Sequence, residues 1–166
     1  MATGKQKFIM SVAYSPDGKR VACGEAEGGV HVFDLERGVV LGRLDGHAAT
    51  VRTLNFAPDG SLLATGSDDG YAMLHDLTTL RPVATLEGHT SWVLGSSFSP
   101  DGAFLATCGA DKAIRVWDVA NRACLQTLAD CHSDQVWGVA FDPSAAGKRF
   151  ASVGDDNTVR VFDTGM

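Results

Sequence analysis

The 166-residue sequence lacks the features that mark membrane, secreted and metal-binding proteins. No stretch approaches the roughly 18 apolar residues of a membrane-spanning helix, and the first seven residues lack the apolar run of a secretory signal. The four cysteines form no Cys-x-x-Cys pair, which argues against zinc and disulfide frameworks and favours buried, reduced thiols. The net charge of -6 argues against general attraction to nucleic acid or anionic membranes.

Helical periodicity is also lacking, since no segment of ten residues repeats its apolar side chains at helical spacing. Short runs rich in β-branched and aromatic residues, such as 51–56 and 71–75, are instead separated by Gly, Asp and Pro, as strands joined by tight turns are. Within residues 113–117, Ile114 and Val116 are predicted on one face of a strand and their neighbours on the other. The predicted fold class is therefore all-β.

Three sequence markers recur with one period of about 42 residues. The first is a Pro-Asp-Gly turn, found at residues 15–18, 57–60 and 99–102, with a longer fourth version that begins at Asp142-Pro143-Ser144. The second is a Gly-His pair, found at residues 46–47 and 88–89 and altered to Cys131-His132. The third is an aromatic residue or His followed by Asp, found at residues 33–34, 75–76, 117–118 and 162–163. This period predicts the four-stranded blades of a β-propeller.

The spacing from Gly-His to Trp-Asp, with Asp111 six residues before Trp117, resembles the WD-repeat family across nearly the whole chain. In that family a His, a Ser or Thr, an Asp and a Trp form a buried hydrogen-bonded tetrad in each blade. The resemblance implies one complete tetrad, made of His89, Thr107, Asp111 and Trp117. Two incomplete sets are His47, Thr65 and Asp69, with His75 in place of Trp, and His132, Ser152 and Asp156, with Phe162 in place of Trp. The first unit departs entirely, with Lys5, Cys23, Glu27 and Phe33 at these positions.

A His-Asp pair beside a hydroxyl also resembles the arrangement used for nucleophilic catalysis. The same trio occurs in three successive units, however, whereas an active site occurs once, so we expect a structural role. No metal-ligand cluster or phosphate-binding glycine loop is apparent in the sequence. We therefore expect a protein without catalytic activity and without a cofactor.

The family presents three positions of each repeat on the narrow top face of the propeller, and these define the expected partner-binding surface. Carried over unit by unit, they are Phe8, Met10 and Ala26; Thr50, Arg52 and Asp68; Trp92, Leu94 and Ala110; and Gln135, Trp137 and Asp155. Five are large apolar side chains, which predicts an exposed protein-binding patch: Phe8, Met10, Trp92, Leu94 and Trp137. One alternative is that the Trp side chains fill the core between blades. Another is that Phe8, Trp92 and Trp137 form an aromatic cage that reads methylated lysine in peptides.

Several segments resemble the WD-repeat subunit family of the Ski complex, namely residues 7–18, 67–71, 88–94, 134–139 and 152–156. Members of that family are seven-bladed propellers, found in animals and plants also in the polymerase-associated factor complex. The resemblance implies a scaffold in mRNA decay and in transcription elongation and chromatin modification, located in the nucleus and the cytoplasm. The implied partners are the large helical-repeat scaffold subunit of the Ski complex and subunits of the polymerase-associated factor complex, without direct contact with nucleic acid or membrane.

The repeats predict blades at about residues 8–44, 50–86, 91–128 and 135–163, and the fourth ends before its outermost strand. Such an arc leaves strand edges and blade faces open, which favours self-association. Three explanations follow. The favoured one is that the chain is part of a seven-bladed ring. Alternatively, two copies form an eight-bladed ring, or the chain docks onto another propeller-like partner.

Overall fold

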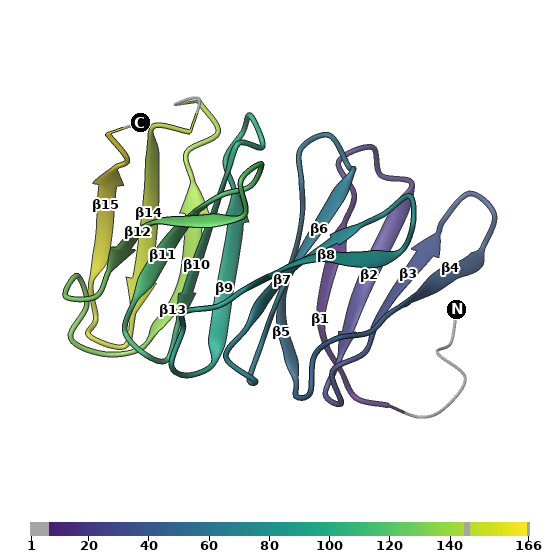
Figure 1. Cartoon of the computed structure of the whole chain (residues 1–166), viewed down its shortest axis with the longest axis horizontal. Coiled ribbons are helices and arrows are strands. Elements are labelled where there is room, and N and C mark those ends of the chain that lie inside the picture. The colour runs from purple at the N-terminus through teal and green to yellow at the C-terminus, as the bar shows by residue number, and fades with distance from the viewer. Residues whose placement is uncertain (1–6, 145–146, 166) are drawn as a thin grey trace.

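The computed structural model describes residues 7–144 and 147–165, which form 15 strands in four antiparallel sheets (Figure 1). The fold class is all-β, as predicted. Blade 1 contains β1 (Ile9–Tyr14), β2 (Arg20–Glu25), β3 (Val30–Asp34) and β4 (Val39–Leu44). Blade 2 contains β5 (Val51–Phe56), β6 (Leu62–Ser67), β7 (Ala72–Asp76) and β8 (Arg81–Leu86). Blade 3 contains β9 (Val93–Phe98), β10 (Phe104–Gly109), β11 (Ile114–Asp118) and β12 (Ala123–Leu128), and blade 4 contains β13 (Val136–Phe141), β14 (Arg149–Gly154) and β15 (Val159–Asp163).

Each blade is a meander, because every strand pairs with the next one along the chain. The turn between the first two strands shows how the sequence enforces this. Gly18 has a φ of 69° and donates its backbone N–H to the carbonyl of Ser15, while the Asp17 carboxylate accepts the N–H of Lys19. Gly60 and Gly102 close the corresponding turns of blades 2 and 3 with φ of 71° and 73°. The tight turns predicted at the repeated Pro-Asp-Gly are thus observed.

The hydrophobic core lies between neighbouring blades rather than inside any one of them. Three clusters of buried side chains each join one blade to the next. Ile114 and Val116 lie in the cluster shared with blade 4, whereas Trp117 lies in the cluster shared with blade 2. Since burial of one such side chain contributes about 1.5–3 kcal/mol, each blade depends on its neighbours for much of its stability.

The first strands of the four blades lie next to one another, with β5 against β1 and β9, and β9 also against β13. Polar side chains connect them. The Ser11 hydroxyl donates to the carbonyl of Val51 over 2.8 Å, and the hydroxyls of Thr53 and Ser96 lie 2.8 Å apart. The Phe98 N–H donates to Asn55 Oδ1 over 3.0 Å, and the Phe141 N–H donates to Ser97 Oγ over 3.1 Å. These strands therefore set the spacing of the arc.

Two predicted features fall outside the described residues: Lys5, at the His position of the first unit, and Ala145-Ala146, in the long turn of the fourth. Residues 7–144 and 147–165 contain no helix long and apolar enough to cross a membrane.

Candidate functional site

The tetrad of blade 3 is a continuous chain of buried hydrogen bonds. His89 Nδ1 lies 2.9 Å from the nearer carboxylate oxygen of Asp111, and His89 Nε2 lies 2.9 Å from Thr107 Oγ1. Trp117 Nε1 donates to the same hydroxyl over 2.9 Å. In the tautomer that donates its Nδ1 proton to the carboxylate, Nε2 accepts the Thr107 proton. Every polar atom of the set is therefore satisfied, and the chain links β10, β11 and the turn between them to the loop before β9.

Blades 2 and 4 repeat this arrangement with fewer members. In blade 4, His132 lies 2.9 Å from Asp156 and 2.7 Å from the Ser152 hydroxyl, and in blade 2, His47 lies 2.9 Å from Asp69 and 2.7 Å from Thr65. The structure thus brings together all the His, Ser or Thr and Asp residues that the repeats singled out. Phe162, at the Trp position of blade 4, carries no donor and instead stacks on Phe150 with 5.0 Å between ring centroids.

His75 occupies the Trp position of blade 2 and satisfies only one of its two ring nitrogens. Its Nε2 lies 3.2 Å from Thr65 Oγ1, but its buried Nδ1 has no hydrogen-bond partner among the described residues. Burial, together with the neighbouring His47, lowers the pKa of His75 from 6.5 to about 4. The side chain is therefore neutral at physiological pH.

The tetrad carboxylates are held in the ionised form. Burial raises the pKa of Asp69 and Asp111, but hydrogen bonds from backbone N–H groups and from the tetrad histidines outweigh this, so that both pKa values lie below the usual range. In Asp156 the hydrogen bond from the Thr158 hydroxyl is the largest cause of a lowered pKa, despite burial, and His132 adds to it. Each carboxylate also accepts the N–H of the residue after its histidine, namely Ala48, Thr90 or Ser133. The tetrads thereby fix the loops that lead into β5, β9 and β13.

Blade 1 replaces the tetrad with a charged network that the repeats did not predict. Glu25 is fully buried and accepts hydrogen bonds from Lys7 Nζ over 3.0 Å and from His31 Nε2 over 2.9 Å. Lys7 Nζ also lies 2.7 Å from Glu27, which stands at the tetrad Asp position. Burial raises the pKa of Glu25, but the bonds from Lys7 and His31 outweigh it and leave the pKa below 4.5. The only sign of this network in the sequence is Glu25 itself, which stands in blade 1 at the position equivalent to Ser67 of blade 2.

The predicted top-face positions come together in pairs, one pair for each blade. One member of each pair directly precedes the tetrad Asp position, and the other comes three residues after the tetrad His position. The backbone N–H of the first donates to the carbonyl of the second over 2.9 Å. This bond joins Ala26 to Phe8, Asp68 to Thr50, Ala110 to Trp92, and Asp155 to Gln135. In each blade this bond ties the loop before the first strand to the turn after the second strand, and these segments make up the rim of the top face.

Four of the five large apolar residues on this rim are exposed. Trp92 is 46% exposed and Trp137 is 50% exposed, and Phe8 and Met10 are also exposed. The prediction of an exposed side chain was wrong for Leu94, which is buried because β9 packs between β5 and β13. The third tryptophan, Trp117, belongs to the core. The exposed large apolar residues of the rim are therefore Phe8, Met10, Trp92 and Trp137, and this set is named here the aromatic rim.

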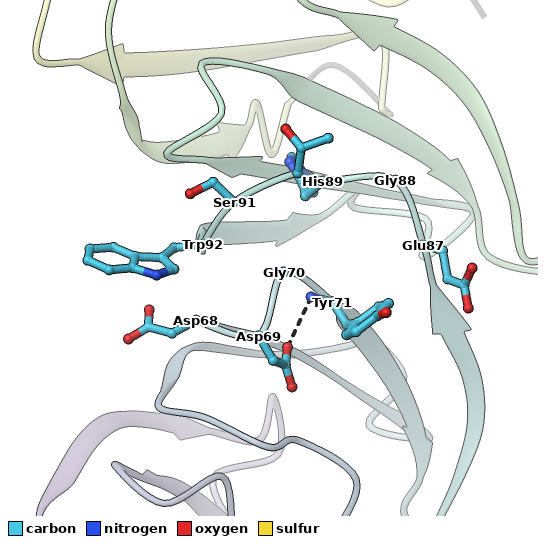
Figure 2. A pocket seen from close by; sticks show the side chains of 10 residues that line it. Asp68, Asp69, Gly70, Tyr71, Glu87, Gly88, His89, Ser91 and Trp92 are labelled. Carbon is cyan, nitrogen blue, oxygen red and sulfur yellow. Dashed lines mark hydrogen bonds between the residues drawn. The ribbon is translucent and has the colours of Figure 1, made fainter.

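A groove of about 460 Å³ adjoins Trp92 between blades 2 and 3 (Figure 2). Its walls are the turn at residues 68–71 and the segment at residues 87–92. Figure 2 shows Trp92 and Asp68 on one side of this groove and Tyr71 and Glu87 on the other. Tyr71 is 42% exposed and lies outside the mapped top-face positions, so the repeat pattern could not identify it. The described part of the chain has no group of three His, Cys, Asp or Glu residues that could hold a metal ion.

Comparison with known proteins shows which family the four repeats match. Residues 2–34, 38–76, 80–118 and 122–163 match the WD domain, G-beta repeat family. Among solved structures, that of U3-55K superposes with a TM-score of 0.88 over 98% of this chain and 50% of that chain, at 23% identity, which shows a shared fold.

Two relatives match shorter segments. WD repeat-containing protein VIP3 of Arabidopsis thaliana is 50% identical over 52 residues, which is 31% of this chain and 16% of the relative. Nuclear distribution protein PAC1 of Gibberella zeae is 46% identical over 55 residues, which is 33% of this chain and 11% of the relative. The matched segments thus span a small part of each relative's own length.

Proposed function

The chain belongs to the WD domain, G-beta repeat family, and we propose that it is a non-catalytic scaffold that binds other proteins through its aromatic rim. The observation that carries this proposal is the exposure of Trp92, just before β9, and of Trp137, in β13, at 46% and 50%, where the tetrads hold the preceding loops in place. Large aromatic side chains on a fixed rim are typical anchors of protein interfaces.

The tetrads themselves do not support catalysis. The side chains of His89 and His132 are fully buried, and each ring is bonded to a carboxylate at one nitrogen and to a hydroxyl at the other. A catalytic His-hydroxyl pair has to face a substrate, whereas the Thr107 hydroxyl is enclosed between His89 and Trp117. Repetition in three blades and the bonding of both ring nitrogens in His89 and His132 favour a structural role.

The finer proposal is a subunit of Ski-type and polymerase-associated factor complexes, acting in mRNA decay and in transcription elongation and chromatin modification. Its support is the resemblance of residues 7–18, 67–71, 88–94, 134–139 and 152–156 to the Ski WD-repeat subunits, together with the 50% identity to VIP3 over 52 residues. The proposed partners are the large helical-repeat subunit of the Ski complex and polymerase-associated factor subunits, and the proposed location is nucleus and cytoplasm.

Binding measurements with single rim variants test this proposal. Purified helical-repeat Ski subunit, and separately the polymerase-associated factor subunits, are titrated against the chain by calorimetry. Trp92→Ala and Trp137→Ala are each expected to weaken binding about 30-fold, the equivalent of about 2 kcal/mol for an aromatic anchor. Leu125→Ala is the matched control, because Leu125 is equally exposed, at 49%, but lies on the outer strand β12. Equal affinities for all variants would rule out the rim as the binding surface.

The alternative of a methyl-lysine reader has less support, because the Trp92 ring already carries a cation. The guanidinium of Arg52 lies 5.7 Å from the ring centroid. A histone-tail titration with unmodified and trimethylated peptides separates the two functions, since a scaffold shows no dependence on methylation.

A further inference from the structure

A second groove lies between blades 2 and 3, at the end of the strands opposite the aromatic rim. It has a volume of about 470 Å³ and is bordered by the Pro-Asp-Gly turns of both blades, so it is named here the turn groove. Trp92 directly precedes β9, whereas the turn at residues 99–102 directly follows it, which places rim and groove at opposite ends. Blade 2 packs on blades 1 and 3, and blade 3 packs on blades 2 and 4, so the groove belongs to an internal junction.

Apolar side chains and two carboxylates line the turn groove. The apolar lining comes from both blades and consists of Ala57, Pro58, Leu62, Pro100 and Val119. The carboxylates are those of Asp59 and Asp101, one from each turn, and both residues are exposed. A hollow with apolar walls and a few fixed polar groups is the usual form of a binding site.

Both carboxylates are oriented by their own turns. The backbone N–H of Ser61 donates to Asp59 Oδ1 over 3.0 Å, and the Ser61 hydroxyl donates to both Asp59 oxygens. Asp101 Oδ1 accepts the Ser99 hydroxyl over 2.6 Å and the Ala103 N–H over 3.0 Å. These bonds hold the pKa of Asp59 and of Asp101 below the usual range, so both are negatively charged at neutral pH.

The equivalent carboxylates of blades 1 and 4 have cations from their own blade. Asp142 accepts a hydrogen bond of 2.8 Å from Arg149. For Asp17 the hydrogen bond from Ser15 is the largest cause of a lowered pKa, and the charges of Arg20 and Lys19 add to it. Each turn Asp outside the groove thus has a positive charge beside it.

The two carboxylates at the groove have no such cation among the described residues, because the repeat changes at two positions. The residues two and three after the turn Asp are Lys19 and Arg20 in blade 1, Ser61 and Leu62 in blade 2, and Ala103 and Phe104 in blade 3. In residues 7–144 and 147–165, neither Asp59 nor Asp101 forms an ion pair, and no neighbouring positive charge lowers either pKa. The replacement of Arg by Leu also adds to the apolar lining. The groove therefore combines an apolar surface with two negative charges that the chain does not neutralise.

We propose that the turn groove binds a segment of a partner protein in which a lysine or arginine stands next to a large apolar side chain. The cation of the partner pairs with Asp59 and Asp101, as Arg149 pairs with Asp142 within blade 4. The apolar side chain of the partner packs on Leu62 and Val119. This surface is additional to the aromatic rim, so that one scaffold holds two partners at once, one at each end of its blades.

Selection from a peptide library tests the proposal on the whole chain. The chain carrying Trp92→Ala and Trp137→Ala is immobilised, so that the aromatic rim does not contribute, and it selects from heptapeptides with every position randomised. The selected peptides are expected to share a Lys or Arg next to Leu, Ile, Met or Phe. The preferred peptide is then labelled and titrated by fluorescence anisotropy against the wild-type chain and single variants. Because the rim is removed before selection, this result is independent of whether the rim binds its own partners.

Asp59→Asn and Asp101→Asn are each expected to weaken binding of the selected peptide about tenfold, as for the loss of a charged hydrogen-bond partner. Asn keeps the Oδ1 acceptor for the bonds of the turn, so the urea midpoints should change little. Asp17→Asn is the matched control, because it removes the same charge from the same turn of blade 1, outside the groove. Its unchanged affinity would separate the groove from general attraction of basic peptides to a chain with a net charge of -6.

A gain of cations inside the groove provides the converse test. Ser61→Lys with Leu62→Arg gives blade 2 the pair that blade 1 carries at the same positions, so the fold is expected to tolerate it. The new cations neutralise the groove, and binding of the selected peptide should be lost. If the double variant does not fold, Ser61→Lys alone is used, with a loss of affinity of about tenfold expected.

Three results would overturn the proposal. Selected peptides without a preference for Lys or Arg would show that the carboxylates recognise no cation. Equal affinities for the Asp17, Asp59 and Asp101 variants would mean that basic peptides bind elsewhere on the chain. Full binding by the folded Lys-Arg double variant would show that the groove is not the site.

Discussion

The guanidinium of Arg52 in blade 2 lies 5.7 Å from the centroid of the Trp92 ring in blade 3. The same guanidinium donates two hydrogen bonds, of 2.9 and 2.8 Å, to the Asp68 carboxylate, which holds the cation in position. A cation over an indole face at this separation is attracted by the ring quadrupole. Trp92 is therefore oriented before any partner arrives, which reduces the entropy that binding has to remove.

Replacing Arg52 is expected to loosen Trp92 without destabilising the fold. In a Trp137→Phe background Trp92 is the one exposed indole, because Trp117 is buried. Arg52→Gln should then raise the acrylamide quenching constant of the fluorescence, while the free energy of unfolding changes by less than about 1 kcal/mol, as for partly exposed ion pairs. Arg52→Lys retains the charge but loses the bidentate geometry, so its quenching constant should lie between those measured with Arg52 and with Arg52→Gln. Identical quenching in all three proteins would contradict the ordering role of Arg52.

Thr107→Val is expected to destabilise the chain by about 1–3 kcal/mol, because the buried Trp117 N–H and His89 Nε2 both lose their partner. Urea denaturation followed by circular dichroism measures the loss. Thr78→Val serves as the control, since Thr78 is exposed and uses only its backbone N–H, bonded to Asp76. Equal midpoints for the two variants would show that the tetrad does not contribute to stability.

His75 should make stability depend on pH between 6.5 and about 4. Above pH 6.5 the side chain is neutral in both states; as the pH falls towards 4, the unfolded state binds a proton that the folded state, with its pKa of about 4, does not. The free energy of unfolding should therefore fall by about 3 kcal/mol across this window.

His75→Phe is expected to remove this part of the pH dependence. The substitution is suitable because Phe33 and Phe162 occupy the same position in blades 1 and 4. Unfolding by urea at pH 7, 6, 5 and 4.5 gives the difference between the two proteins, which should grow as the pH falls. A constant difference would mean that His75 does not titrate with a lowered pKa.

The charged network of blade 1 should depend on one carboxylate much more than on the other. Glu25→Gln weakens the bonds from Lys7 and His31 inside the fold, and a loss of about 2–3 kcal/mol is expected, as for hydrogen bonds to charged groups. Glu27→Gln is a matched control, because Glu27 contacts the same lysine but its side chain is 68% exposed. Its effect should stay below about 1 kcal/mol. Thermal denaturation of both variants provides the comparison.

Much of the fold could be predicted because its determinants are local and repeated. The Pro-Asp-Gly turns specify hairpins through φ and side-chain hydrogen bonds, and residues that recur every 42 positions necessarily occupy equivalent places in successive blades. His89 and Thr107 could therefore be paired from spacing and family resemblance before their contact was seen.

What could not be predicted depends on neighbours that the repeat pattern does not encode. Leu94 occupies a top-face position like Trp137, but its exposure is decided by the strands on either side of β9. Glu25 departs from the repeat, so its partners Lys7 and His31 became apparent only once β2 and β3 were paired. Tyr71 reaches the surface beside the groove from a position that the family pattern leaves unassigned.

The polar contacts between the first strands have a consequence for the order of the blades. Each contact is chemically different: a hydroxyl meets a carbonyl at Ser11, a hydroxyl meets a hydroxyl at Thr53, and a carboxamide oxygen meets an amide N–H at Asn55. Exchanging blade 3 for another blade would place Val12, Leu54 or Val139 at the position of Ser96, so the Thr53 hydroxyl would lose its partner. The tetrads make the blades look interchangeable, but the side chains of the innermost strands differ from blade to blade. A gene in which the repeats were shuffled would therefore encode a chain whose neighbouring first strands no longer make these polar contacts.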